Sequence, residues 1–130
     1  MITRKAQETL VRLARGFPVI AVTGPRQSGK TTLARATFPD KPYMSMEDPD
    51  TRLLAENDPR GILSRFPDGV VLDEVQRTPE LFSYLQTYVD AEVRPGKYVL
   101  TGSQQFGLLS GITQSLAGRV GMVRLLPFSL

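Results

Sequence analysis

The sequence has 130 residues, of which 41% are hydrophobic and 22% are charged, as is typical of a globular domain and not of a disordered chain. It contains neither cysteine nor histidine, which excludes disulfides, zinc sites built from these residues, and catalysis by a thiolate or an imidazole. The length fits one domain, 1–130, and no apolar run approaches membrane-spanning length, so we expect a cytoplasmic protein without a membrane partner.

The formal charge of +3 is distributed unevenly along the chain. Basic residues dominate 1–42 and 93–130, whereas acidic residues dominate 43–92. Basic ends of this kind would attract an anionic partner such as nucleic acid. A nucleotide domain, however, needs the same positive potential around its triphosphate. Because the sequence does not place the basic residues on a single face, nucleic-acid binding stays an open alternative.

The chain begins with a pattern of helix, strand and helix. Residues 3–15 carry apolar side chains at helical spacing, with Thr3 as the N-cap, and so predict an amphipathic helix. Residues 17–23 form a short apolar run rich in Val and Ile, which is typical of a strand buried on both faces of a parallel sheet. Residues 30–38 return to helical spacing, and Pro39 ends that helix.

Strands and helices continue to alternate in the remainder of the chain. We expect strands at 43–46, 69–73, 98–101 and 120–126. We expect helices between them: two short ones separated by Asn57, Asp58 and Pro59, one capped by Thr78 with Pro79 at its first position, and one that ends at Gly118. This alternation predicts an α/β fold with a parallel sheet and ligands at the carboxyl ends of the strands.

The loop after the first strand, GPRQSGKT, matches the phosphate-binding pattern G-x-x-x-x-G-K-[ST] in full. Its glycines allow successive amide N–H groups to converge on phosphate oxygens, and the following helix adds the positive end of its dipole. We expect Lys30 to reach the β and γ phosphates, the Thr31 hydroxyl to bind magnesium, and the Thr32 amide to assist. The predicted nucleotide-binding residues are Gly24, Pro25, Arg26, Gln27, Ser28, Gly29, Lys30, Thr31 and Thr32.

Two carboxylates, Asp73 and Glu74, follow the apolar strand at 69–73. Burying two unpaired charges is costly, so we expect them at the edge of the sheet and not in the core. Asp73 is suited to hold magnesium, largely through a bound water, and Glu74 to activate the attacking water as a general base. Without the phosphate loop, the same pair would be interpreted as a solvated strand end.

Two further positions are candidates for catalytic roles. The strand at 98–101 runs into Thr-Gly-Ser, where Ser103, or else Thr101, is placed to sense the γ phosphate or to orient water; an ordinary Gly-Ser turn is the alternative. Arg119 follows a predicted helix end. It would serve either as a finger that completes a neighbouring subunit's active site or as a simple cation at the helix C-terminus.

These motifs resemble those of prokaryotic AAA-type P-loop ATPases whose ATPase module precedes a C-terminal domain of unknown function. The resemblance lies in four segments, in this order: GPRQSGKTTLAR, VVLDEVQRTPELFSYLQ, YVLTGSQQFGLL and LAGRVGMVRLLPFSL. It implies a P-loop fold with a five-stranded, mainly parallel sheet of the additional-strand, catalytic-glutamate class. It also implies ATP, Mg²⁺ and assembly into homo-oligomers. Members of the family continue into a helical lid and the C-terminal domain, which we expect this chain to lack after Leu130.

The resemblance assigns catalytic roles to Lys30, Glu74, Ser103 and Arg119, and metal-binding roles to Thr31 and Asp73. The leading functional hypothesis is magnesium-dependent ATP hydrolysis by a motor or switch. The alternative is a nucleotide-binding module with little turnover that regulates a partner protein or DNA. A phosphotransferase ranks third, since the sequence offers neither a second substrate pocket nor a basic lid.

Overall fold

The protein is built around a five-stranded parallel sheet. The computed structural model describes residues 4–25, 28–103 and 105–125. The strand order is β2-β3-β4-β1-β5, and every neighbouring pair is parallel. The strands are β1 (Val19–Thr23), β2 (Tyr43–Ser45), β3 (Val70–Asp73), β4 (Tyr98–Gly102) and β5 (Val120–Arg124). All five carboxyl ends therefore meet at one edge of the sheet, as the sequence predicted.

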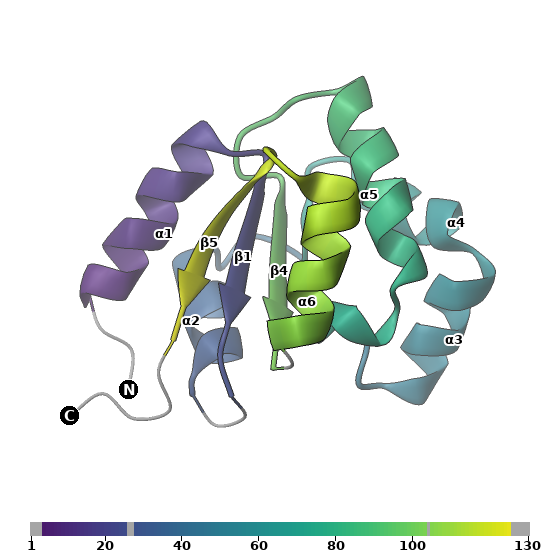
Figure 1. Ribbon diagram of the computed structural model, residues 1–130, viewed down its shortest axis with the longest axis horizontal. Coiled ribbons are helices and arrows are strands. Elements are labelled where there is room, and N and C mark those ends of the chain that lie inside the picture. The colour runs from purple at the N-terminus through teal and green to yellow at the C-terminus, as the bar shows by residue number, and fades with distance from the viewer. Residues whose placement is uncertain (1–3, 26–27, 104, 126–130) are drawn as a thin grey trace.

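Helices cover both faces of this sheet (Figure 1). One face is covered by α1 (Arg4–Gly16) and α2 (Lys30–Thr37). The other is covered by α3 (Pro49–Asn57), α4 (Pro59–Ser64), the 3₁₀ turn η1 (Val75–Arg77), α5 (Glu80–Ala91), α6 (Gln105–Gly111) and the π-helical turn η2 (Ile112–Leu116). The predicted α/β fold with a five-stranded parallel sheet is confirmed.

Alternate residues of strand β1 pack into two separate hydrophobic cores, one on each face of the sheet. Val19 and Ala21 pack into the cluster below α5, whereas Ile20 and Val22 pack against α1 and α2. All four are completely buried. This two-sided burial explains why the strand is a continuous apolar run and not an alternating one. Among the described helices, none is long and apolar enough to cross a membrane.

The two predicted short helices are present as α3 and α4, and only Asp58 lies between them, because Asn57 belongs to α3 and Pro59 to α4. The Asp48 carboxylate accepts from the Thr51 amide at 3.0 Å, and the Asp58 carboxylate accepts from the Gly61 amide at 3.0 Å. A proline follows each of these aspartates at the first helical position. Proline fits there because its missing N–H would have no helical partner in any case.

The predicted cap of α5 is wrong. The helix begins at Glu80, and its N-cap residue Pro79 makes no side-chain cap. The Thr78 hydroxyl is buried and has no hydrogen-bond partner within the described residues. Thr78 instead closes the 3₁₀ turn η1 through its backbone, because its N–H donates to the Val75 carbonyl at 3.0 Å. The chain thus enters α5 from a preceding turn, which directs the Thr78 side chain into the core.

Other predicted boundaries shift slightly. The first strand begins at Val19 and not at 17. The last strand ends at Arg124, so it does not include Leu125, and residue 126 of its predicted range lies outside the described residues. The predicted cap Thr3 also lies outside them. The helix predicted before Gly118 is present as α6 and η2, and Gly118 has φ +80°. A left-handed glycine of this kind is a common way to leave a helix.

Candidate active site

The phosphate loop joins the carboxyl end of β1 to the start of α2, at the edge where all strands end. Gly29 immediately precedes α2 with φ +86°, a left-handed conformation that favours glycine. A side chain at Gly24 would meet the Ser28 hydroxyl at 2.7 Å. Both glycines of the motif are therefore required by the shape of the loop. Arg26 and Gln27, also predicted to bind nucleotide, lie outside the described residues.

A hollow of about 350 Å³ opens at the start of α2, lined by Gly29, Lys30, Thr31 and Thr32. These are the predicted phosphate-binding residues at the positive end of the helix dipole. Lys30 is only 6% exposed. Pro25 and Ser28 belong to the same loop, where the Ser28 amide donates to the Pro25 carbonyl at 3.2 Å. The buried Ser28 hydroxyl has no hydrogen-bond partner among the described residues.

Asp73 ends β3 and receives four hydroxyl hydrogen bonds. Thr31 Oγ1 and Thr101 Oγ1 donate to its Oδ1 at 2.6 and 2.5 Å. Tyr43 OH and Ser45 Oγ donate to its Oδ2, each at 3.0 Å. Burial and the Asp73 charge raise the pKa of Tyr43. Asp73 thus lies against Thr31, the other predicted metal ligand, and its orientation is fixed from three neighbouring elements.

Hydroxyl and carboxylate oxygens are the ligands that Mg²⁺ prefers, and it often uses only one or two protein ligands, with water and phosphate supplying the rest. Thr31 and Asp73 fit this description because their oxygens face each other directly. Among the described residues, no cluster of three or more acidic side chains could form an all-protein cage for a metal. The pair is therefore suited to magnesium that arrives with a nucleotide.

Glu74 has an unusual backbone, since it is the only non-glycine with positive φ (52°) in the described part of the chain. Such a conformation costs about 1 to 3 kcal/mol and persists only where the surroundings impose it. Here the Glu74 amide donates to Thr101 Oγ1 at 3.3 Å, and that hydroxyl in turn donates to Asp73. Thr101 therefore connects the two acidic residues.

The Glu74 carboxylate is held by three residues. Its Oε1 accepts from Ser103 N at 3.1 Å, from Ser103 Oγ at 2.7 Å and from Gln76 Nε2 at 2.7 Å. Its Oε2 forms an ion pair with Lys30 Nζ at 3.1 Å. Burial by itself would raise the pKa of Glu74, but the bonds from Gln76, Ser103 and Lys30 together lower it. The carboxylate is therefore ionised at neutral pH.

Both acids lie at the edge of the sheet, as expected, but the expectation that they escape burial is wrong. Asp73 is 5% exposed and Glu74 is 3% exposed. Burial is tolerated because each carboxylate is fully partnered: Asp73 by hydroxyl groups, and Glu74 by Lys30 and hydrogen-bond donors. The sequence argument assumed unpaired charges, and it could not see the partners that other strands supply.

The structure brings together most of the predicted site but leaves Arg119 apart from it. Arg119 lies just before β5, at the amino end of the sheet, where its carbonyl accepts from the Val19 amide at 3.2 Å. Its guanidinium forms two hydrogen bonds with Asp90 of α5, at 2.7 and 2.9 Å. Arg119 therefore cannot reach the phosphate loop of its own chain, and its role as a finger toward a neighbour stays a prediction.

Three contact residues were missed by the sequence analysis: Tyr43, Ser45 and Gln76. Ser45 pairs in register with Asp73 across β2 and β3, and no local sequence pattern predicts this pairing. Gln76 lies two residues after Glu74, and this proximity was the one available signal.

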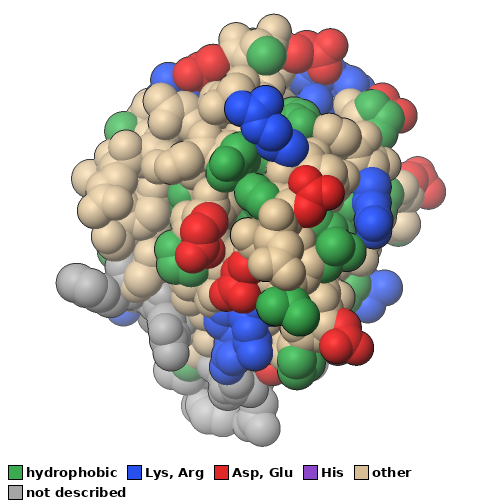
Figure 2. All heavy atoms as spheres, turned by 90° about the vertical axis from the view of Figure 1, so that its right-hand side faces the viewer, with side chains coloured by type: hydrophobic (Ala, Val, Ile, Leu, Met, Phe, Trp, Pro, Cys, Tyr) green, Lys and Arg blue, Asp and Glu red, His purple; other side chains and the backbone are tan. Residues whose placement is uncertain are grey.

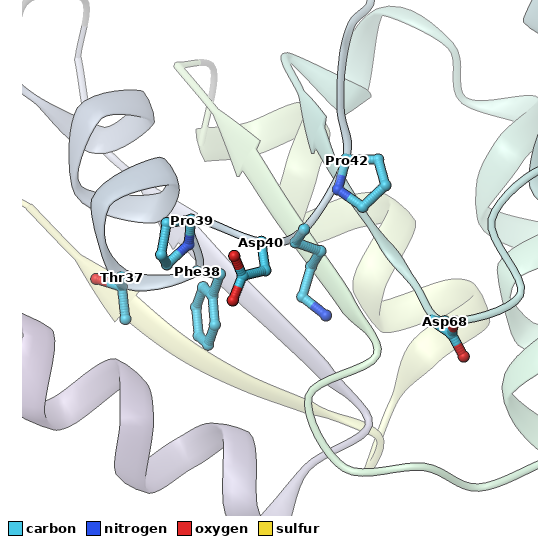
Figure 3. Close-up of a pocket in the computed structure, with 7 residues that line it drawn as sticks. Thr37, Phe38, Pro39, Asp40, Pro42 and Asp68 are labelled. Atoms are coloured by element: carbon cyan, nitrogen blue, oxygen red, sulfur yellow. The ribbon is translucent and has the colours of Figure 1, made fainter.

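A second hollow of about 410 Å³ lies away from this site, around the end of α2 and the segment that leads to β2 (Figure 3). Its lining includes Phe38, Asp40 and Lys41. Burial and the nearby Arg94 charge lower the pKa of Lys41. None of the predicted site residues lines this hollow, so the candidate chemistry belongs to the carboxyl end of the sheet.

Comparison with known proteins gives independent information on the family and the fold of this chain. A family model described as an AAA domain matches residues 16–130. The uncharacterized protein Rv2008c of Mycobacterium tuberculosis is 40% identical over 125 residues, which are 94% of this chain but only 28% of that protein.

Two solved structures share the fold. The Walker-type ATPase paby2304 of Pyrococcus abyssi has a TM-score of 0.67 at 19% identity, over 97% of this chain and 53% of that one. The P-loop NTPase domain of the sigma-54 transport activator from E. coli has a TM-score of 0.58 at 16% identity, over 98% of this chain and 100% of that one. At these identities the likeness establishes the fold alone.

Proposed function

Since this chain belongs to the AAA domain family, we propose that it binds ATP and hydrolyses it with magnesium, as the ATPase part of a motor or switch. One observation carries the proposal: Lys30 and Thr31, adjacent in the phosphate loop, lie against Glu74 and Asp73, adjacent at the end of β3. Lys30, the proposed phosphate-binding cation, thus faces the proposed general base Glu74. Thr31, a proposed magnesium ligand, faces Asp73, the other one.

Phosphate binding would fall to the loop and to Lys30. The amides at the start of α2 and the dipole of that helix favour an anion in the hollow beside Lys30. Lys30 is already held in place by its ion pair with Glu74. In our proposal the β and γ phosphates replace Glu74 as the partner of Lys30, because they carry more charge and more acceptor oxygens than one carboxylate.

Magnesium would be held by Thr31 and by Asp73, directly or through water, and would neutralise charge on the phosphates. Tyr43, Ser45 and Thr101 orient Asp73 for this task. These three hydrogen bonds fix the orientation of the Asp73 carboxylate, which limits the reorganisation needed when a nucleotide enters.

Glu74 is proposed as the general base that accepts a proton from the attacking water. Its lowered pKa keeps it ionised at neutral pH, and Ser103 and Gln76 fix its Oε1. When Lys30 turns to the phosphates, Oε2 becomes the free oxygen that faces the site. Ser103 would then report the state of the γ phosphate through its bond to the same carboxylate.

A nucleotide-binding module with little turnover is the second candidate, and the Glu74 contacts favour it specifically. Both carboxylate oxygens are engaged in this structure, so no oxygen is free to activate water until the Lys30 pair opens. If the pair persists beside bound ATP, the chain would bind nucleotide and control a partner without hydrolysis.

The test compares binding with turnover in Glu74→Gln and in a matched control, Glu56→Gln on the exposed side of α3. We expect Glu74→Gln to bind ATP and to lose phosphate release by at least about a hundredfold, the lower end of what a positioned base contributes. Glu56→Gln should match the parent. ATP binding by the parent without phosphate release would support the module, whereas no binding would overturn both candidates.

A further inference from the structure

The outer face of α1 carries the net charge of the whole molecule. The helix contains four basic residues and one acidic residue, so its formal charge equals the +3 of the complete chain. The remainder of the chain has equal numbers of basic and acidic residues. The sequence could not place basic residues on a single face, but the structure does.

The basic side chains share one side of the helix. Leu10 is completely buried, and Leu13 and Ala14 pack beside it on the sheet, which turns the opposite side of α1 to solvent. A shallow hollow of about 420 Å³ on that side is lined by Arg4, Gln7, Glu8, Val11, Arg12 and Arg15. We call these six residues, together with Lys5 beside them, the α1 stripe. At its centre Val11 is 38% exposed.

The cations of the stripe are free to bind a ligand. Within the described part of the chain, the side chains of Arg4, Lys5, Arg12 and Arg15 form no ion pair and no hydrogen bond. Figure 2 shows the opposite side of the molecule, over α3, α4 and α5, where acidic and basic side chains are interspersed. The α1 stripe is therefore a surface of one dominant sign, and not a sample of the general surface.

From this surface we infer that α1 binds the phosphate backbone of double-stranded DNA without reading its sequence. Arg4 and Arg15 are about 16 Å apart along the axis at 1.5 Å per residue. Successive phosphates of one DNA strand are about 3.4 Å apart along the duplex axis, so the length of the helix spans several of them. A rigid helix holds its cations in a line, so the surface matches a regular array of charges better than an irregular one.

The composition of the stripe favours duplex DNA over other nucleic acids. Surfaces that bind single strands stack bases on aromatic side chains, and α1 has none. Duplex RNA is recognised through its 2′-hydroxyls as well as its phosphates, and Gln7 is the only neutral hydrogen-bonding side chain in the stripe. Arginine and lysine side chains are sufficient to contact the phosphate backbone of DNA. The affinity of such contacts depends on the salt concentration and not on the base sequence.

The experiment measures binding of a fluorescent 20-base-pair DNA duplex to the 130-residue chain by anisotropy, from 50 to 200 mM salt and without nucleotide. Arg12→Gln/Arg15→Gln removes two phosphate contacts. We expect the slope of log affinity against log salt to fall by about 1.8, and the affinity at 50 mM salt to fall about tenfold or more. Arg60→Gln/Arg65→Gln, two exposed arginines of the other face, makes the same charge change and should bind as the parent does.

A substitution in the opposite direction separates contact from misfolding. Glu8 is the only acid in α1 and would face the same phosphates. Glu8→Gln should therefore tighten binding about threefold, from the repulsion of unit charges roughly 6 Å apart in water. A damaged helix would not gain affinity.

Three outcomes would overturn the inference. The first is an unchanged salt slope in Arg12→Gln/Arg15→Gln. The second is an equal loss in the Arg60→Gln/Arg65→Gln control, which would mean that overall charge and not the α1 stripe attracts DNA. The third is tighter binding of single-stranded DNA, duplex RNA or polyglutamate than of the DNA duplex, which would assign the stripe to another partner. Because no nucleotide is present, these results are independent of the proposed ATPase activity.

Discussion

The two ends of the parallel sheet each carry an ion pair, and the pairs differ in burial more than in geometry. At the carboxyl end, Lys30 and Glu74 are 3.1 Å apart, with side chains 7% and 4% exposed. At the amino end, Arg119 and Asp90 are 2.7 Å apart, with side chains 30% and 48% exposed. The shorter contact is the more hydrated one.

This difference shows that distance is a poor guide to the energetic weight of a pair. Water screens the Arg119 pair, and most exposed pairs of this kind contribute little to stability. The Lys30 pair is buried, so removing one partner leaves a charge without compensation. At the carboxyl end of the sheet, the stability of each charged group therefore depends strongly on its partner. This suits a site where a bound ligand would replace Glu74 as the partner of Lys30.

The largest effect should come from Lys30→Ala. The variant leaves the buried Glu74 carboxylate without its cation, so we expect a loss of about 3 to 5 kcal/mol in the free energy of unfolding. Urea denaturation at pH 7 measures it. Adding Glu74→Gln removes the orphaned charge and should restore part of the loss. If the double variant is no more stable than Lys30→Ala, the two groups are not coupled as the ion pair implies.

The second effect is a pH dependence that differs between the two ends. The pKa of Glu74 in the folded protein lies below its ordinary 4.5, so its stabilisation is complete above pH 4.5 and is lost as the pH falls below it. Hydrogen bonds from Arg119 lower the pKa of Asp90 from its ordinary 3.8. The stabilisation that Asp90 contributes is therefore lost only as the pH falls below 3.8.

Urea midpoints between pH 5 and pH 3 distinguish these windows. Glu74→Gln should flatten the decline that begins near pH 4.5, because glutamine does not titrate. Asp90→Asn should leave that part of the curve as in the parent. An unaltered acid decline in Glu74→Gln would show that another carboxylate dominates this range.

The third effect compares two tyrosines. Tyr43 donates to Asp73 at the carboxyl end, so Tyr43→Phe should cost about 1 kcal/mol, given that this side chain is only partly buried. Tyr98 begins β4 at the amino end, and its buried hydroxyl has no partner among the described residues. Burial raises the pKa of Tyr98 to about 12.

Tyr98→Phe should therefore be neutral or stabilising, because it removes a polar atom whose hydrogen bond is not satisfied. Thermal unfolding of both variants measures the contrast. Equal losses of stability in the two variants would contradict this prediction. They would indicate that the hydrogen bond from Tyr43 to Asp73 contributes no more to stability than the unpaired Tyr98 hydroxyl does.

Arg119→Ala should have only a small effect on stability, since its pair with Asp90 is exposed. Its effect on turnover is the informative measurement. An arginine that completes a neighbour's site acts only in an assembly, so ATP turnover by the parent should rise faster than linearly with protein concentration. Arg119→Ala should abolish that rise. Turnover proportional to concentration in both proteins would leave Arg119 as a local helix-end cation.

A mixture of inactive variants sharpens this test. Arg119→Ala chains retain Glu74, and Glu74→Gln chains retain Arg119. If the finger acts between chains, mixing them should restore part of the activity, because an intact Glu74 site can then face an intact Arg119. A mixture that co-assembles and stays inactive would contradict the finger role.

Local patterns in the sequence were enough to predict the fold and the central motifs. The buried strands, the glycines of the phosphate loop and the acidic pair after β3 depend on residues close together in the chain. Their physical requirements, namely an apolar run, a left-handed turn and a charged strand end, are therefore visible in short segments. The α/β fold and the positions of Lys30, Thr31, Asp73 and Glu74 at one edge followed from these requirements.

Only the tertiary structure decided what surrounds those residues. The register of β2, β3 and β4 brings Ser45 and Thr101 to Asp73, and long-range register is set by packing and not by any local pattern. The burial of both carboxylates depends on those partners, which is why a rule for unpaired charges failed. The pairing of Arg119 with Asp90 and the exposure of the basic α1 stripe likewise arise from how helices pack on the sheet, because that packing determines which side of each helix meets water.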